Sequence, residues 1–207
     1  MHPLVINMHA LAKKIAIILV LGVFLSACAP KKQAVKPSAP APVVAVAPQD
    51  KPVMLSLEQS LNSGEYSKAQ NIAEDLLKRY PSMASLHINL GVIDLRLKNY
   101  EAALEHFENG LSLNASYVHG YLFLGETQVA LAKYKEAEKS YLKALDLNPN
   151  EIYAHIGLGV IYDLYLMDFG KAEDHYEAFL EGADGKIDAE QIKKVQTWLK
   201  LLARKSA

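Results

Sequence analysis

Residues 84–117 read ASLHINLGVIDLRLKNYEAALEHFENGLSLNASY, and residues 118–151 read VHGYLFLGETQVALAKYKEAEKSYLKALDLNPNE. Aligned without a gap, these two 34-residue stretches carry similar side chains at the same positions. Leu90-Gly91 falls on Leu124-Gly125, Tyr100 on Tyr134, Ala103 on Ala137 and Phe107 on Tyr141. A fixed period of this length indicates structural units that bury their apolar faces only against their neighbours. The chain is therefore predicted to be a stack of repeated units.

The same alignment extends in both directions and gives four units. They span residues 50–83, 84–117, 118–151 and 152–186. The pattern resembles the tetratricopeptide repeat family, whose unit of about 34 residues is a pair of antiparallel helices. The resemblance implies an all-α fold, an α-solenoid of antiparallel helix pairs over residues 50–186.

Small residues recur at two positions of the period, where we expect the two helices of a pair to approach closely. They are Gly91, Gly125 and Gly159 in the first helices and Ala69, Ala103, Ala137 and Ala172 in the second helices. Aromatic residues at a third position are expected to fill the space between successive pairs; they are Phe107, Tyr141 and Tyr176. The fourth unit has one extra residue between its helices, so we expect an altered turn at residues 166–170.

Residues 187–207 are predicted to form a C-terminal capping helix. Asp188 can cap the helix N-terminus, with Gln191 as its capping-box partner. Apolar residues then recur at helical spacing, and they are Ile192, Val195, Leu199 and Leu202. Because an open end of a repeat stack must be covered, this helix is expected to pack on the last repeat. The alternative is a helix that exposes Trp198 to a membrane surface or a partner.

Residues 1–27 are predicted to be a lipoprotein signal peptide. Lys13 and Lys14 precede the apolar run 15–25, which is shorter than the ~20 residues of a membrane-spanning helix. The run ends in Leu-Ser-Ala-Cys, which resembles the lipobox of bacterial lipoproteins. This resemblance implies that Cys28 carries palmitate and becomes the mature N-terminus. The alternative is an ordinary secretory signal with an incidental cysteine, and translation could start at Met1 or Met8.

Residues 28–49 are predicted to be an extended linker behind the lipidated Cys28. They contain five prolines among alanine, valine and lysine, a composition that favours an extended spacer. Ala29 stands where an aspartate would favour retention at the inner membrane in enteric-type lipoproteins. We therefore expect a lipid anchor in the outer membrane with the folded part in the periplasm; the inner membrane is the alternative.

Composition argues against several classes of function. All 23 acidic residues and 17 basic residues lie from Asp50 onward, and this net charge of −6 disfavours a nucleic-acid surface. The single cysteine excludes an internal disulfide, and the seven histidines show no metal-ligand spacing. Nucleophile-elbow and phosphate-loop motifs are absent from the sequence. We therefore expect neither an enzyme nor a bound cofactor or metal.

The resemblance implies that the first helices line a groove for a protein partner. The implied positions are Ile88, Asn89, Val92, Leu95, Arg96, His119, Leu122, Phe123, Glu126, Val129, Tyr153, Ile156, Val160 and Asp163. Because most of these residues are apolar, the expected ligand is a helical or extended apolar peptide. The alternatives are that some of them pack under the C-terminal helix or in a homodimer.

One known mode of binding in this family is disfavoured by the residues themselves. Relatives that clamp the terminal carboxylate of a peptide use lysine, asparagine and arginine at five positions of the groove. Here these positions hold Met54, Glu58, Asn89, His119 and Phe123, of which only the asparagine fits. A carboxylate clamp is therefore not expected.

Together these features predict a membrane-anchored periplasmic scaffold that works by holding a partner protein. The resemblance to small lipidated repeat proteins implies a role in assembling a pilus, a secretion system or another outer-membrane machine. The alternative is an adaptor that tethers and regulates peptidoglycan hydrolases.

Overall fold

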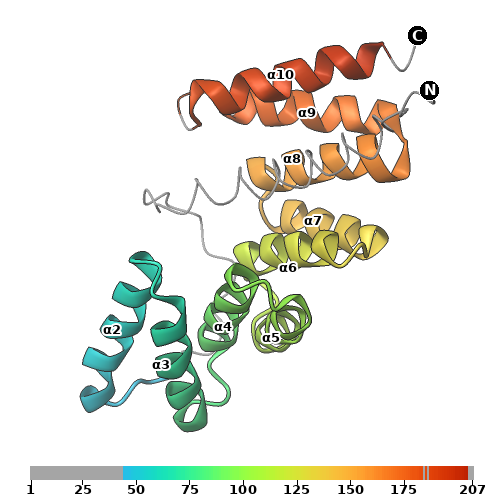
Figure 1. Ribbon diagram of the computed structural model, residues 1–207. Coiled ribbons are helices and arrows are strands. Elements are labelled where there is room, and N and C mark those ends of the chain that lie inside the picture. Colours follow the sequence, from blue (N-terminus) through green and yellow to red (C-terminus); the bar gives the residue numbers. More distant parts are fainter. Residues whose placement is uncertain (1–43, 184, 186, 205–207) are drawn as a thin grey trace, which may run out of the picture. The chain divides into compact units, whose positions relative to one another are not determined.

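The computed structural model describes residues 44–183, 185 and 187–204, and all regular elements in this part of the chain are helical. The described residues fall into two compact units, 44–149 and 150–204, and each is described by itself. We call them the N-terminal and the C-terminal unit (Figure 1). The predicted signal peptide, Cys28 and the linker up to residue 43 lie outside the described residues.

The N-terminal unit consists of three antiparallel helix pairs. Its helices are α2 (Lys51–Asn62), α3 (Tyr66–Arg79), α4 (Ala84–Arg96), α5 (Tyr100–Leu113), α6 (Val118–Ala130) and α7 (Tyr134–Leu147). The pairs stack in chain order, because α3 packs against α4 and α5 packs against α6 (Figure 1). The first helices of the second and third pairs begin 34 residues apart, as the period predicts.

The C-terminal unit holds a fourth pair and one further helix. Its elements are α8 (Ile152–Ile161), the π-helical turn η2 (Tyr162–Leu166), α9 (Phe169–Ala183) and α10 (Ala189–Ala203). The predicted all-α fold of stacked antiparallel helix pairs is thus confirmed for the described residues.

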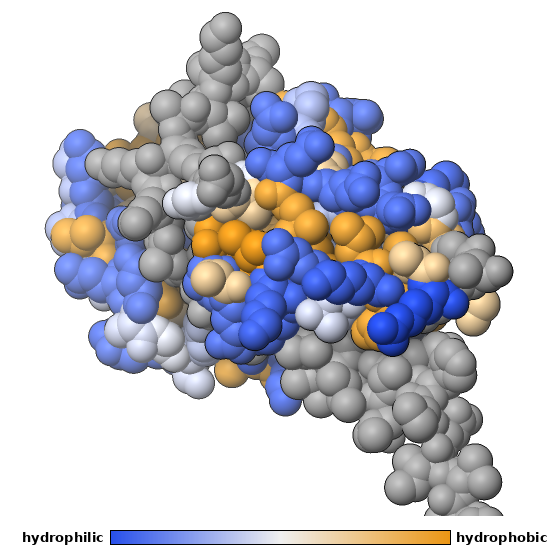
Figure 2. Space-filling model, turned by 90° about the horizontal axis from the view of Figure 1, so that it is seen from above, coloured by the Kyte–Doolittle hydropathy of each residue, from blue (hydrophilic) through white to orange (hydrophobic). Residues whose placement is uncertain are grey.

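Helix α10 packs on α9, as predicted for a capping helix. The Asp188 carboxylate accepts a hydrogen bond from the Gln191 backbone N–H at 3.0 Å, which confirms the predicted N-cap. The Trp198 ring lies 5.9 Å from the ring of Tyr176, so it contacts α9 and is only partly exposed. Seen from the side of α10, hydrophilic side chains flank an apolar strip (Figure 2), and Leu201 of this helix is 47% exposed.

In three pairs a glycine of the first helix lies under an aromatic ring of the second helix: Gly91 under Phe107, Gly125 under Tyr141 and Gly159 under Tyr176. A Cβ atom at Gly159 would be 2.5 Å from Cδ1 of Tyr176, so no larger residue fits without a shift. The prediction that these rings fill the space between pairs was therefore incomplete. They pack first within their own pair, while Phe107 also stacks on Phe123 of the next pair at 5.9 Å.

The turn between the two helices of a pair contains one left-handed residue. In successive pairs these residues are Gly64, Lys98, Ala132 and Met167, with φ of 74°, 65°, 59° and 55°. In the first three pairs the N–H of the next residue bonds to the carbonyl five residues back, as in Lys133 to Gln128 at 2.8 Å. In the fourth pair Asp168 bonds to Tyr162, six residues back, at 3.0 Å. The extra residue therefore lies in η2, which ends at Leu166, and it changes the hydrogen bond that closes the turn, so the expected alteration near residues 166–170 is confirmed.

The first pair begins earlier than the predicted linker boundary. Val44 and Val46 pack against the core of this pair, and the Ala47 N–H donates to the Tyr80 hydroxyl at 2.9 Å. That hydroxyl donates in turn to the Asp50 carboxylate at 2.6 Å, which is also paired with Arg79. Residues 44–49 therefore belong with the folded part and not with an extended spacer.

Candidate functional site

The predicted groove residues of the N-terminal unit lie on α4 and α6, which contact each other directly. Five of them are buried: Ile88, Leu95, Leu122, Glu126 and Val129. Ile88 and Leu95 belong to one core cluster with Phe107, so the prediction that they line a groove is corrected. Ile88 fills the space between α4, α5 and α6, because its Cδ1 would meet a Cβ atom at Gly110 or Gly120.

Four predicted residues remain accessible, and we call them the α4–α6 face: Asn89, Val92, His119 and Phe123. His119 is exposed and the other three are partly buried. On each helix they follow the three- and four-residue spacing that places side chains on one side. The α4–α6 face is the part of the predicted surface that a partner can reach.

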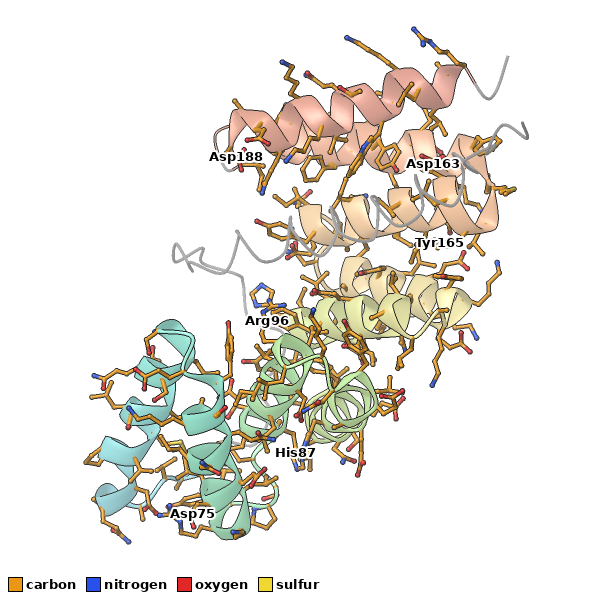
Figure 3. All side chains as sticks on the ribbon, viewed as in Figure 1. Asp75, His87, Arg96, Asp163, Tyr165 and Asp188 are labelled. Carbon is orange, nitrogen blue, oxygen red and sulfur yellow. The ribbon has the colours of Figure 1, made fainter. Side chains whose placement is uncertain are left out.

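Arg96 lies against this face, near the C-terminal end of α4 (Figure 3). Its guanidinium carbon is 5.9 Å from the centre of the Phe123 ring. That ring stacks on the ring of Phe107, which lies on α5, the helix paired with α4. The Arg96 side chain is only 7% exposed, and its Nη1 lies 3.5 Å from Oε1 of Glu126. A stacked cation of this kind holds an aromatic ring in place by cation–π attraction of about 0.5–2 kcal/mol.

Glu126 is the most unusual ionisable group of the N-terminal unit. Its side chain is 1% exposed, and neither carboxylate oxygen has a hydrogen bond of good geometry within the described residues. Burial raises the pKa of Glu126 to about 7, and the nearby Arg96 opposes that shift. Burial, followed by the same carboxyl, raises the pKa of the Tyr141 hydroxyl well above its usual value. The sequence analysis placed Arg96 and Glu126 separately among the groove positions. Both lie on first helices of consecutive repeats, and this was the signal from which their contact could have been predicted.

The remaining predicted groove residues lie in the C-terminal unit, on α8 and η2. Ile156, Val160 and Asp163 are buried, which leaves Tyr153 as the only partly exposed member of this group. The Asp163 carboxylate accepts a hydrogen bond from the Tyr176 hydroxyl at 3.5 Å. These contacts give Asp163 a structural role within the fourth pair instead of the predicted place in a groove.

Two histidine pairs join the helices of the second and fourth repeats. The rings of His87 and His106 lie 5.8 Å apart, and those of His155 and His175 lie 5.3 Å apart. The sequence analysis found no metal-ligand spacing among the histidines and did not predict that these side chains meet. Among residues 44–204, as far as they are described, no group of three or more histidine, cysteine, aspartate or glutamate side chains could hold a metal ion.

These features describe a helical-repeat protein in which a face of the first helices α4 and α6 remains accessible to a partner. Residues 61–116 and 118–151 match sequence models described as Tetratricopeptide repeat. The chain is therefore a tetratricopeptide repeat protein.

Solved structures share the fold. MamA (residues 41 to the end) from Desulfovibrio magneticus RS-1 is 23% identical with a TM-score of 0.60, over 67% of this chain and 77% of that chain. The first tetratricopeptide repeat domain of Spaghetti (RPAP3), bound to the HSP90 peptide SRMEEVD, is 27% identical with a TM-score of 0.53, over 54% of this chain and 88% of that chain.

Among curated proteins, Cell division cycle protein 27 homolog A from Arabidopsis thaliana is 42% identical over 53 residues. The match covers 26% of this chain and only 7% of that protein. This chain therefore spans only a small part of that protein.

Proposed function

We propose that this protein is a lipid-anchored scaffold that holds a partner protein on the α4–α6 face and catalyses no reaction. The observation that carries the proposal is the partly exposed Phe123 ring, whose centre lies 5.9 Å from the centre of the Phe107 ring and 5.9 Å from the guanidinium carbon of Arg96. A rigid aromatic group beside a charged one is a frequent anchor in protein interfaces. The similar repeat domain of Spaghetti, in complex with a peptide, supports a peptide segment as the ligand.

The ligand that fits this face is an apolar segment, helical or extended, with a polar group for Asn89. Phe123 and Val92 offer apolar contact, and Asn89 offers an amide at the same side of α4. A carboxylate clamp finds no support, because exposed His119 and aromatic Phe123 stand where the resemblance implies cations. The peptide SRMEEVD, labelled with a fluorophore, should accordingly show no saturable binding to this protein by fluorescence polarisation.

The proposed role is assembly of an outer-membrane machine such as a pilus or a secretion system. Crosslinking in the native cell, followed by purification and mass spectrometry, should recover a component of such a machine. Phe123→Ala should reduce capture at least tenfold, whereas Leu142→Ala on α7, where the side chain is 39% exposed, should leave it unchanged. His119→Glu provides a second variant at an exposed site, where loss of capture cannot follow from unfolding. Recovery of peptidoglycan hydrolases alone would replace the assembly role by the tethering role.

We propose that a lipid on Cys28 anchors the protein in the outer membrane, with the folded part in the periplasm. Within the described residues no helix has the length and apolar character needed to cross a bilayer. Cells fed radioactive palmitate should label the protein, and Cys28→Ser should remove the label. Equal labelling of both proteins would contradict the anchor without affecting the binding face.

A further inference from the structure

Charge is distributed unevenly between the repeats and the end of the chain. Residues 50–188 contain 12 basic and 22 acidic side chains, which gives a net charge of −10. Residues 189–207 contain five basic side chains and one acidic side chain, which gives a net charge of +4. The chain from Asp50 onward therefore combines acidic repeats with a basic C-terminal end, and α10 makes up most of that end.

The basic side chains of α10 lie on its outer side. Lys193, Lys200 and Arg204 are exposed, and their spacing of seven and then four residues places them on one side of the helix. Val195 and Leu202 are buried on the opposite side, where α10 packs on α9. Figure 3 shows side chains with nitrogen at their tips that project from α10 away from α9. Packing on the repeats therefore leaves the basic side of this helix accessible.

The positive charge of this side is only partly balanced by the protein itself. Nζ of Lys194 lies 2.8 Å from Oε1 of Glu190, which is the single acidic residue of 189–207. Among the described residues, Lys193, Lys200 and Arg204 form no ion pair. Three cationic side chains are therefore available to anions outside the molecule.

An exposed apolar side chain lies beside these cations. Leu201 directly follows Lys200 and is 47% exposed. Trp198 does not add to this surface in the same way, because its ring packs on the ring of Tyr176 at 5.9 Å. Seen from the side of α10, an apolar strip runs between hydrophilic side chains (Figure 2). Lysine and arginine beside an apolar group are typical of helices that lie on a lipid surface.

We propose that the outer side of α10, with Lys193, Lys200, Leu201 and Arg204, docks on the surface of an anionic phospholipid membrane. Clusters of lysine and arginine on a helix attract anionic headgroups. Flexible cations along one exposed helix face suit a flat array of headgroups better than a single carboxylate of a protein. The same headgroups repel the acidic repeats, so the attraction selects α10 within the folded part. This docking goes beyond the proposed anchor and needs no lipid on Cys28.

The test uses the full chain with Cys28→Ser, so that no attached lipid contributes. Vesicles of phosphatidylcholine alone are compared with vesicles that also contain phosphatidylglycerol, and both carry a dansyl-labelled lipid. Trp198 is the single tryptophan of the chain and lies on α10, so energy transfer from it to the dansyl group reports how close this helix lies to the membrane. The partition coefficient from this signal should be at least tenfold higher on the anionic vesicles. High salt should remove the difference, because it screens the attraction.

Charge reversal separates α10 from the lysines that precede Asp50, which are the same in every sample. Lys193→Glu with Lys200→Glu should lower the partition coefficient on anionic vesicles at least tenfold. The matched control Lys139→Glu with Lys143→Glu makes the same change of net charge at exposed positions of α7 and should leave it unchanged. Lys193→Gln with Lys200→Gln should give an intermediate value, which keeps the test valid if charge reversal disturbs α10.

Two outcomes would overturn the proposal. Equal partition coefficients on neutral and anionic vesicles would leave an acidic protein as the partner of this side of α10. Equal losses in the α10 and α7 variants would show a response to overall charge instead of to this helix. Neither outcome bears on the lipid anchor, which the palmitate label tests separately.

Discussion

The third and fourth helix pairs have the same internal packing but differ in their first helices. In both, a glycine lies under a buried tyrosine ring, Gly125 under Tyr141 and Gly159 under Tyr176. In both, the second helix begins two residues after a left-handed residue. Only the fourth pair has an extra residue, and there α8 continues into the π-helical turn η2 before the left-handed Met167.

This difference shows which parts of the repeat tolerate an insertion. The contact between the glycine and the ring is retained because it depends on close packing. The left-handed turn is retained because it depends on one backbone conformation. The helix between them can widen by one residue, since a π-helical turn changes the backbone pattern from i→i−4 to i→i−5 over a single turn. The packing of the pair is therefore fixed more tightly than the length of its first helix.

The largest expected effect comes from filling the space under the rings. Gly159→Ala and Gly125→Ala should each lower the free energy of unfolding by about 1–3 kcal/mol, because the buried ring cannot move aside. The loss should be greater at Gly159, where the added Cβ would lie 2.5 Å from the ring, than at Gly125, where it would lie 2.8 Å away. Urea denaturation followed by circular dichroism measures both.

Gly170→Ala is the matched control for these two variants. Nothing lies within 4 Å of a Cβ atom at Gly170, near the start of α9. This substitution should leave stability unchanged or raise it by about 0.5–1 kcal/mol, because alanine favours a helix over glycine. A destabilised Gly170→Ala, or neutral substitutions at the other two glycines, would show that the packing is described wrongly.

The two pairs should respond to pH in opposite directions. Burial raises the pKa of Glu126 from 4.5 to about 7, so its stabilising contribution is complete below pH 4.5 and is lost as pH rises through 7. Burial, followed by the neighbouring His155, lowers the pKa of His175 from 6.5 to about 4. Its contribution is present above pH 6.5 and is lost as pH falls through 4.

Unfolding free energies between pH 4 and 8 separate these two effects. Relative to the unmodified protein, Glu126→Gln should become more stable as pH rises, because glutamine cannot ionise. His175→Gln should become relatively more stable as pH falls. Variants whose curves run parallel to that of the unmodified protein would contradict both assignments.

A smaller difference is expected between the two tyrosine hydroxyls. The Tyr141 hydroxyl is buried without a hydrogen-bond partner in the described residues, whereas that of Tyr176 donates to Asp163 at 3.5 Å. Tyr141→Phe should therefore be neutral or stabilising, and Tyr176→Phe should cost about 1 kcal/mol. Thermal unfolding of the two variants side by side tests this, and equal losses would argue against it.

The smallest effect concerns the shared turn. Ala132 and Met167 have φ of 59° and 55°, a conformation that costs a non-glycine residue about 1 kcal/mol. Ala132→Gly and Met167→Gly should each stabilise the protein by up to ~1 kcal/mol, less the greater flexibility of glycine in the unfolded chain. A gain at Ala132 with a loss at Met167 would mean that the left-handed residue after η2 has a role that glycine cannot fill.

The sequence was sufficient to predict the helix pairs, the N-cap of α10 at Asp188 and the presence of one extra residue before Phe169. The period does not show how deep a side chain lies, which is why Ile88 and Leu95 were assigned to the groove although they pack in the core. Proline-rich composition predicts extension but not docking, so the contact of Ala47 with Tyr80 was missed.

The groups that meet across helices were the hardest to predict. Arg96 and Glu126 are 30 residues apart, and His87 and His106 are 19 apart, so each pair becomes visible only when the helices are placed side by side. The alignment of the repeats indicates in principle which helices lie side by side. The raised pKa of Glu126 can be inferred only from its actual burial and its distance to Arg96.

The most direct test of the central proposal, that the α4–α6 face holds a partner, is site-specific photocrosslinking in the native cell. A photoreactive residue at exposed His119 on α6 should form a covalent adduct with one partner protein. The same residue at exposed Lys139 on α7 should form none with that partner. Adducts from Lys139 but not from His119 would contradict the proposal and would place the partner on the second helices.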